Sequence, residues 1–249
     1  MIGLVAPAKL TWFLEITGVR ANGYHELRSE MVTLDFADRL TLEPDGDYLR
    51  LSEENPDVPL DETNLVARAL RLVGRRAGVT IEKVIPPGGG LGGGSADAGA
   101  VLRWAGGVSV EEALTLGGDV PFCQLGGRAL VEGVGEKLTP LSFEKRDVTL
   151  MMPSFSVGTR RCYEAYDELV ANGARPTGRN HLEMAACVVE PRLARTLEWL
   201  RGEYARGVEL CGSGSAMFLE GRLDSGAVQW DVAGPEGTVR FRQTTTTPR

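Results

Sequence analysis

The chain has 249 residues, of which 32 are glycine, and carries a formal net charge of −7. This length fits one large domain or two closely packed ones, and 43% hydrophobic residues can fill a complete core. The acidic balance argues against a broad nucleic-acid-binding surface but leaves room for a local basic pocket that holds a phosphorylated small molecule. The glycines are clustered, because six of the seven residues from Gly88 to Gly94 are glycine.

Cysteine, histidine and apolar patterns exclude further classes of protein. The four cysteines are far apart and form no CxxC pair, which disfavours zinc and disulfide frameworks and fits a reducing cytoplasm. The only histidines, His25 and His181, are too few for hydrolysis at a multi-histidine metal centre. Neither a run of about 18 apolar residues nor a signal-peptide pattern occurs. We therefore expect a cytoplasmic protein that binds neither nucleic acid nor membrane.

The first third of the chain is predicted to be rich in β-strands. Residues 8–17 are mostly apolar, and residues 30–36 alternate between two faces. Between them, Asn22-Gly23 is typical of a tight turn. Two further short strands are expected at 39–43 and 48–52.

The rest of the chain mixes helices and strands. Helices are predicted at 64–75, 95–105, 109–116, 160–172 and 182–204, the last interrupted by Pro191, and strands at 79–85, 128–132, 148–152, 208–210 and 216–220. The pattern predicts an α+β protein with two lobes, at residues 1–145 and 146–243. Residues 244–249, a threonine run followed by Pro-Arg, are expected to form a disordered tail.

The glycine cluster lies between a predicted strand and a predicted helix, which suits binding of a phosphate group. Glycine lets the backbone approach an anion, and the helix N-terminus supplies free N–H groups. A flexible turn is the simplest alternative. A P-loop fails because no lysine follows these glycines. A dinucleotide fingerprint stays open as a weaker alternative, since Gly88, Gly90 and Gly93 satisfy GxGxxG and Glu111 follows at a suitable distance.

Other segments supply the remaining chemistry. Lys9 begins a strand, Asp119 lies in a Gly-Gly-Asp-Val-Pro turn, and residues 211–215 form a second glycine turn. Each has an ordinary structural explanation when taken alone. Together, a phosphate cradle, a cation and an acid indicate phosphoryl transfer to a small hydroxyl compound.

Four stretches together resemble the GHMP kinase superfamily. They are PAKLTWFLEITGVRANGYHEL, PPGGGLGGGSADA, LGGDVPF and CGSGSA. The resemblance covers residues 5–220 and implies a ribosomal protein S5-like N-terminal domain that binds ATP and a ferredoxin-like C-terminal domain. Gly23-Tyr24-His25 resembles the branch of the superfamily that acts on 4-diphosphocytidyl-2-C-methyl-D-erythritol, a cytidine diphosphate sugar alcohol of non-mevalonate isoprenoid synthesis.

The resemblance also implies roles for individual residues. Asp119 would be the catalytic base, and Lys9 the cation that activates it and stabilises the attacking 2-hydroxyl. The ATP phosphates would contact Pro87, Gly88, Gly89, Gly90, Leu91, Gly92, Gly93, Gly94, Ser95 and Asp97. The substrate would contact Thr11, Tyr24, His25, Thr159, Gly212, Ser213 and Gly214, with Tyr24 stacked on the cytosine and His25 hydrogen-bonded to its edge.

The implied cofactors are ATP and Mg²⁺, with Ser95 as a candidate magnesium ligand, and the implied assembly is a monomer or weak homodimer. The chain departs from the family pattern where it has Thr11 for Asn, Ala96 for Ser, Gly118 for Ala and His181 for Asp. Two alternatives stay open. One is a GHMP-type kinase of another small alcohol, and the other is a non-catalytic nucleotide-binding relative.

Overall fold

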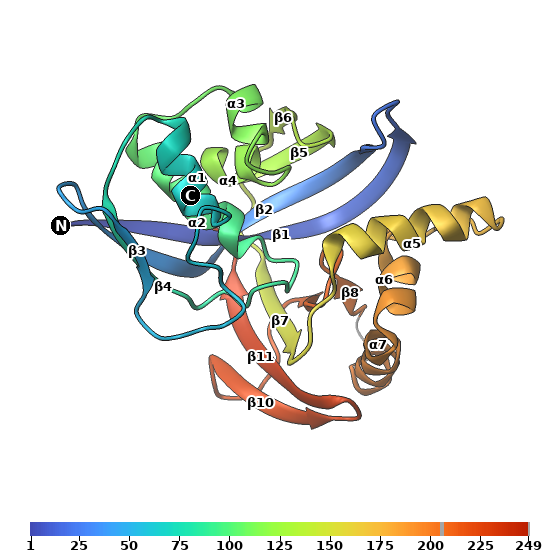
Figure 1. Ribbon diagram of the computed structural model, residues 1–249. Coiled ribbons are helices and arrows are strands. Elements are labelled where there is room, and N and C mark those ends of the chain that lie inside the picture. Colours follow the sequence, from blue (N-terminus) through green and yellow to red (C-terminus); the bar gives the residue numbers. More distant parts are fainter. Residues whose placement is uncertain (205–206, 249) are drawn as a thin grey trace.

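The computed structural model describes residues 1–204 and 207–248 and contains two antiparallel-rich sheets (Figure 1). The first sheet has the strand order β3-β4-β2-β5-β6, with β1 paired to β2. Its strands are β1 (Ile2–Val19), β2 (His25–Glu43), β3 (Tyr48–Leu51), β4 (Gly78–Glu82), β5 (Arg128–Gly133) and β6 (Lys137–Pro140). The helices that accompany this sheet are α1 (Leu65–Leu72), α2 (Gly93–Trp104), α3 (Val110–Leu114) and α4 (Val120–Leu125).

The second sheet has the strand order β10-β11-β7-β9-β8. Its strands are β7 (Asp147–Pro153), β8 (Glu209–Leu210), β9 (Met217–Glu220), β10 (Gln229–Gly234) and β11 (Gly237–Thr245). Helices α5 (Thr159–Ala171), α6 (Glu183–Val189) and α7 (Pro191–Glu203) lie beside it (Figure 1). The predicted α+β class with two sheets is therefore confirmed. The exact division at residue 145 stays a prediction.

Two hydrophobic cores underlie this arrangement. One lies between the first sheet and its helices and includes Leu10 and Leu34, while the other lies between the second sheet and α5–α7 and includes Met151 and Phe241. Helix α2 packs on β1 and against α1 and α4, so its N-terminus is held at a defined place over the sheet. Within residues 1–204 and 207–248, no helix has the length and apolar character needed to cross a membrane.

A long hairpin dominates the first sheet. Strands β1 and β2 pair antiparallel from Ile2↔Leu42 to Val19↔His25. The predicted Asn22-Gly23 turn connects them, and Gly23 takes a φ of +84° there. The separate strands expected at 30–36 and 39–43 are one strand, because residues 37–39 stay paired with β1 rather than forming a turn, and the Asp38 side chain is buried.

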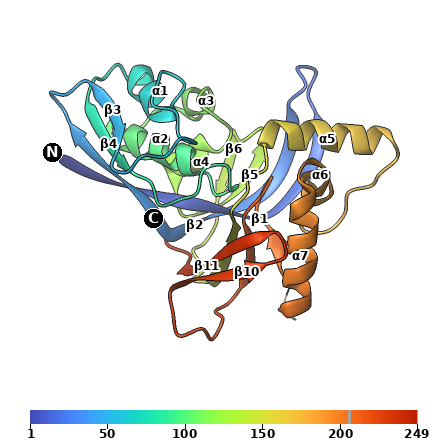
Figure 2. The same cartoon turned by 60° about the horizontal axis from the view of Figure 1, so that its bottom comes forward.

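The prediction of a disordered tail is wrong for residues 244–248, and residue 249 lies outside the described part of the chain. Thr244 pairs with Val148 as part of β11, and Thr246 forms a bridge to Leu34 on β2. Both threonines are 4% exposed. Threonine is β-branched and well suited to strands, so the low-complexity run reflects strand formation. Figure 2 shows β11 beneath the long β1–β2 pair, where it joins the two sheets.

Candidate active site

Lys9 and Asp119 form an ion pair at the centre of the candidate site. Lys9 Nζ lies 3.2 Å from Asp119 Oδ2 and donates a 3.0 Å hydrogen bond to Thr11 Oγ1. Burial acts to lower the pKa of Lys9, but the charge of Asp119, its hydrogen bond to Lys9 and the nearby Cys211 and Cys123 together outweigh it, so the pKa of Lys9 is raised and the side chain stays an ammonium. The Asp119 side chain is 34% exposed, so solvent or a ligand can reach it. The predicted acid–cation pair is thus brought together from positions 110 residues apart in the sequence.

Local structure explains how each partner is placed. Lys9 lies in β1, and its backbone N–H donates to Leu91 O across a distance of 3.0 Å. A register shift in the β1–β2 pairing separates Pro7 from Lys9. Asp119 is the N-cap residue of α4, a short helix that the sequence patterns did not reveal, and Pro121 lies in the first turn of that helix. Proline is favoured at this position because an N–H there would have no partner within the helix, so its absence costs nothing.

The glycine cluster forms a cradle that is packed against the second glycine turn. Gly88, Gly90 and Gly92 have φ values of +68°, +76° and +70°, which glycine adopts without strain. A Cβ at Gly90 would lie 2.4 Å from Cys211 O. Ala216 N donates to Gly89 O at 3.0 Å. The two turns are therefore in direct backbone contact, and only glycine fits at the closest point.

The cradle ends at the N-terminus of α2, as predicted. Gly92 is its N-cap, in the left-handed conformation and without a capping side chain, and Ala96 N makes the first hydrogen bond of the helix, to Gly92 O. The preceding N–H groups of Gly93, Gly94 and Ser95 have no partner within the helix and, with the helix dipole, favour an anion. A Cβ at Gly92 would lie 2.8 Å from Lys9 Cγ, so this anion site lies directly beside Lys9. These features fit the triphosphate of ATP.

Beneath the cradle lies a buried group of three charges. Lys83 Nζ is 2.8 Å from Asp97 Oδ2 and also pairs with Asp38 Oδ2, while Asp38 Oδ1 accepts the N–H of Ile85 at 2.8 Å. Asp97 Oδ1 is buried without a hydrogen-bond partner among the described residues. Burial and the charge of Asp38 raise the pKa of Asp97 to about 7, although the charge of Lys83 acts to lower it. The Asp97 carboxylate thus pairs with Lys83 below the loop, and its contact with ATP stays a prediction.

Replacing this acid is expected to flatten the pH dependence of stability. Because the pKa of folded Asp97 lies above its unfolded value, its contribution to stability is fully present below about pH 4 and is lost as the pH rises through 7. In Asp97→Asn, the fall in Tm between pH 5 and 7 should be smaller, by about 2–4 °C per pH unit. Thermal melts across this range measure the effect, with the exposed Asp45→Asn as the matched control. Parallel Tm profiles for Asp97→Asn and the wild type would contradict it.

Several predicted substrate residues meet beside the ion pair. A Cβ at Gly212 would lie 3.5 Å from Thr11 Oγ1 and 3.6 Å from Lys9 Nζ. Thr159 Oγ1 and Ser213 Oγ are 3.0 Å apart. Thr11, which replaces the family's asparagine, is 2% exposed and turned toward Lys9. The second glycine turn therefore lies beside the Lys9–Asp119 pair, and its contact with substrate stays a prediction.

Asn180 and His181 hold this region in place. Asn180 Nδ2 donates to Leu210 O at 2.9 Å and to Gly212 O at 2.7 Å, which fixes the start of the second glycine turn. His181 Nδ1 accepts the backbone N–H of Ile16 at 3.1 Å. A neutral imidazole can accept this bond as a carboxylate would, so the histidine that replaces the family's aspartate has a structural role.

His25 and Tyr24 lie at the end of the β1–β2 hairpin. The His25 ring packs against Tyr163 with ring centroids 4.9 Å apart, and its Nε2 lies 2.7 Å from Asp167 Oδ1. Burial and, to a smaller extent, the charge of Asp119 raise the pKa of Tyr163, so this ring lies within electrostatic reach of the Lys9–Asp119 pair. Tyr24 is 64% exposed. The stacking of Tyr24 on the cytosine stays a prediction.

Sequence patterns did not single out Tyr163 or Asp167, and gave Asn180 no role. Tyr163 and Asp167 are four residues apart on α5 and both contact His25. Their i, i+4 spacing, on a helix that begins at the predicted substrate residue Thr159, was the signal that could have revealed them. Asn180 follows a stretch without helical or strand periodicity, and only the resemblance of residues 180–183 to the family marked it.

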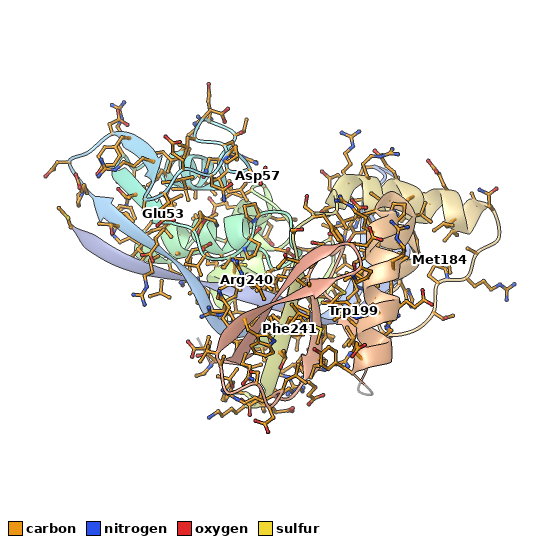
Figure 3. All side chains as sticks on the ribbon, turned by 90° about the horizontal axis from the view of Figure 1, so that it is seen from below. Glu53, Asp57, Met184, Trp199, Arg240 and Phe241 are labelled. Atoms are coloured by element: carbon orange, nitrogen blue, oxygen red, sulfur yellow. The ribbon has the colours of Figure 1, made fainter. Side chains whose placement is uncertain are left out.

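A cavity of about 530 Å³ lies behind the first half of the glycine loop. Its lining includes Pro87 and Gly89 from the loop, Asp57 from the segment before α1, and Arg240 from β11. Figure 3 labels Asp57 and Arg240, which come from the two different sheet regions. The second half of the loop contacts Lys9 instead. The loop thus separates this cavity from the ion pair.

The fold and the site together define the class of the GHMP kinases, and the family model described as "GHMP kinases N terminal domain" matches residues 64–127. The chain is 37% identical to 4-diphosphocytidyl-2-C-methyl-D-erythritol kinase of Nitrosospira multiformis, over 89% of this chain and 83% of that protein. It is 38% identical to the kinase of the same name from Cupriavidus metallidurans, over 86% of this chain and 82% of that one. The chain belongs to the 4-diphosphocytidyl-2-C-methyl-D-erythritol kinase family.

Solved structures agree with this assignment. A crystal structure of 4-(cytidine 5'-diphospho)-2C-methyl-D-erythritol kinase superposes with a TM-score of 0.70 at 31% identity, covering 97% of this chain and 99% of that one. A mevalonate kinase superposes over the whole of both chains with a TM-score of 0.56 at 12% identity, which shows the shared fold alone. The expected two-lobed GHMP kinase fold is confirmed.

Proposed function

We propose that this protein transfers the γ-phosphoryl group of ATP to the 2-hydroxyl of 4-diphosphocytidyl-2-C-methyl-D-erythritol in non-mevalonate isoprenoid synthesis. The observation that carries the proposal is the Lys9–Asp119 pair, 3.2 Å apart, beside a glycine cradle at a helix N-terminus. Membership of the kinase family supports the choice of substrate.

In this proposal Asp119 accepts the proton of the attacking hydroxyl. Its carboxylate is part-exposed and is held by the buried ammonium of Lys9, so it is available to a ligand and fixed in place. Lys9 also offers positive charge to the hydroxyl oxygen as it attacks phosphorus. Phosphoryl transfer needs little covalent chemistry from the protein, so positioning and charge are the main contributions.

The nucleotide is proposed to bind along Gly88–Ser95, with its phosphates on the free N–H groups of α2. No group of three or more His, Cys, Asp or Glu side chains able to hold a metal occurs in the described part of the chain. The phosphates of ATP and the Ser95 hydroxyl are therefore the proposed ligands of Mg²⁺. The metal would neutralise phosphate charge during transfer.

The acceptor substrate is proposed to lie between the second glycine turn and the β1–β2 hairpin. Thr11, Thr159 and Ser213 offer hydroxyl groups to its methylerythritol end. Tyr24 and His25 would recognise the cytosine, with Tyr163 completing an aromatic wall. We also propose that the protein is a monomer or weak homodimer. A cytoplasmic location is proposed as well, because four free cysteines suit a reducing compartment.

Release of ADP in the presence of each of three acceptors tests this function. We expect turnover with 4-diphosphocytidyl-2-C-methyl-D-erythritol and background rates with mevalonate and homoserine. Turnover with either of the latter alone would favour the alternative of another small-alcohol kinase. Nucleotide binding without turnover of any acceptor would favour a non-catalytic relative.

Tyr24→Ala is expected to raise KM for the cytidyl substrate about tenfold or more, because base–aromatic stacking contributes about 1–3 kcal/mol. KM for ATP should stay within about twofold, since Tyr24 lies on the β1–β2 hairpin and not on the glycine loop. Steady-state kinetics with each substrate varied in turn measure both values. Phe143→Ala, another exposed aromatic, is the matched control. Equal losses for both ligands would refute the stacking role.

A further inference from the structure

His25 is tied to α5 by one close polar contact. Its Nε2 lies 2.7 Å from Asp167 Oδ1, and the side chains of the two residues are 8% and 54% exposed. The residues are 142 positions apart, one at the first residue of β2 and the other on the third turn of α5. The contact thus joins the hairpin of the first sheet to a helix of the second.

The same helix fixes the plane of the imidazole ring. Tyr163 packs on His25 with an interplanar angle of 34°, and Tyr166 contacts it edge-on at 86° with centroids 5.8 Å apart. With Asp167 bonded to one ring nitrogen, α5 contacts the ring from three side chains. His25 therefore has a defined orientation before any substrate binds.

The carboxylate also decides which nitrogen carries the hydrogen. An ionised carboxylate can only accept, so Nε2 must donate to Asp167. In the neutral ring, Nδ1 is then a bare acceptor. Nδ1 has no hydrogen-bond partner among residues 1–204 and 207–248, so it is available to a ligand.

We propose that Asp167 is a positioning residue that makes the site select cytosine over uracil by presenting His25 Nδ1 as an acceptor. This inference rests on the proposed function. The exocyclic amino group of cytosine donates to such an acceptor, whereas uracil carries a carbonyl oxygen at the same position, and two acceptors repel. Without Asp167, the tautomer with hydrogen on Nδ1 becomes accessible, and that tautomer accommodates the uracil carbonyl.

The test compares kcat/KM for the cytidine and uridine diphosphate forms of the methylerythritol substrate. In Asp167→Ala, the cytidine-to-uridine ratio should fall about tenfold, the effect of one hydrogen bond of about 1.4 kcal/mol. Asp167→Glu keeps the carboxylate and should restore most of the preference. Glu168→Ala, the neighbouring exposed acid, is the matched control and should leave the ratio unchanged.

A second readout does not depend on activity. The chain contains two histidines, so the nitrogen NMR spectrum of histidine-labelled protein holds only two rings. The neutral His25 ring should show hydrogen on Nε2 in the wild type and a mixture of tautomers in Asp167→Ala. An unchanged tautomer, or equal losses for both substrate forms, would overturn the inference. Failure of the wild type to turn over the cytidyl substrate would instead overturn the proposed function.

Discussion

Asp119→Asn is expected to lower kcat by about a thousandfold while the fold is retained, the loss typical of removing a general base. The amide has nearly the same shape as the carboxylate but cannot accept the proton of the substrate hydroxyl. Since the Asp119 side chain is 34% exposed and caps α4 without a side-chain hydrogen bond, its replacement leaves the packing of the helix intact. KM for ATP should change little, because the phosphates bind at α2.

ADP release under saturating substrates measures the loss, and circular dichroism melts report the fold. Lys9 also donates to Thr11, so its ammonium keeps one partner in the variant. Glu53→Gln, which makes the same chemical change on the exposed segment after β3, should keep the wild-type kcat. A kcat for Asp119→Asn within tenfold of the wild type would show that another group accepts the proton.

Gly90→Ala should disable nucleotide binding and lower thermal stability together. The new Cβ would lie 2.4 Å from Cys211 O and 2.9 Å from Gly214 O, and both obstacles are backbone atoms. The φ of +76° adds a conformational cost of about 1–2 kcal/mol. The two glycine turns must therefore separate, which moves the amides that are proposed to hold the phosphates.

Gly74→Ala separates these two causes. Gly74 has a similar φ of +62°, but a Cβ there would meet nothing within 4 Å. It should show the conformational cost alone and leave nucleotide affinity unchanged. Isothermal titration with ATP and thermal melts compare the two variants. Equal ATP affinities for Gly90→Ala and Gly74→Ala would mean that contact between the turns does not shape the phosphate site.

The sequence was most informative where the chemistry itself restricts the residue. A glycine run between a strand and a helix predicted the cradle, because positive φ and close backbone approach exclude other residues. Lys9 and Asp119 were predicted as partners from residue type and family resemblance, and the fold places them together. The short helix expected from residue 109 and the break at Pro191 also appear as predicted.

Features that depend on distant contacts escaped prediction. Asp167 looks like any exposed helical acid until the fold brings His25 beside it, 142 residues away in sequence. Lys83, Asp38 and Asp97 carry no local sign that they form one buried cluster. The threonine run resembles a low-complexity tail, and its burial depends on β7 and β2, which lie about a hundred and two hundred positions earlier.

The central place of β11 has a consequence for how the chain is made. The strand lies between β10 and β7, and Thr247 N donates to Thr33 O on the other sheet. During synthesis, the edge of β7 that pairs with β11 stays unpaired until residues 237–247 have left the ribosome. Until then, β2 also lacks its hydrogen bond from Thr247. Because domains usually fold as units during synthesis, we expect nascent chains that stop before this strand to be sensitive to protease in both halves.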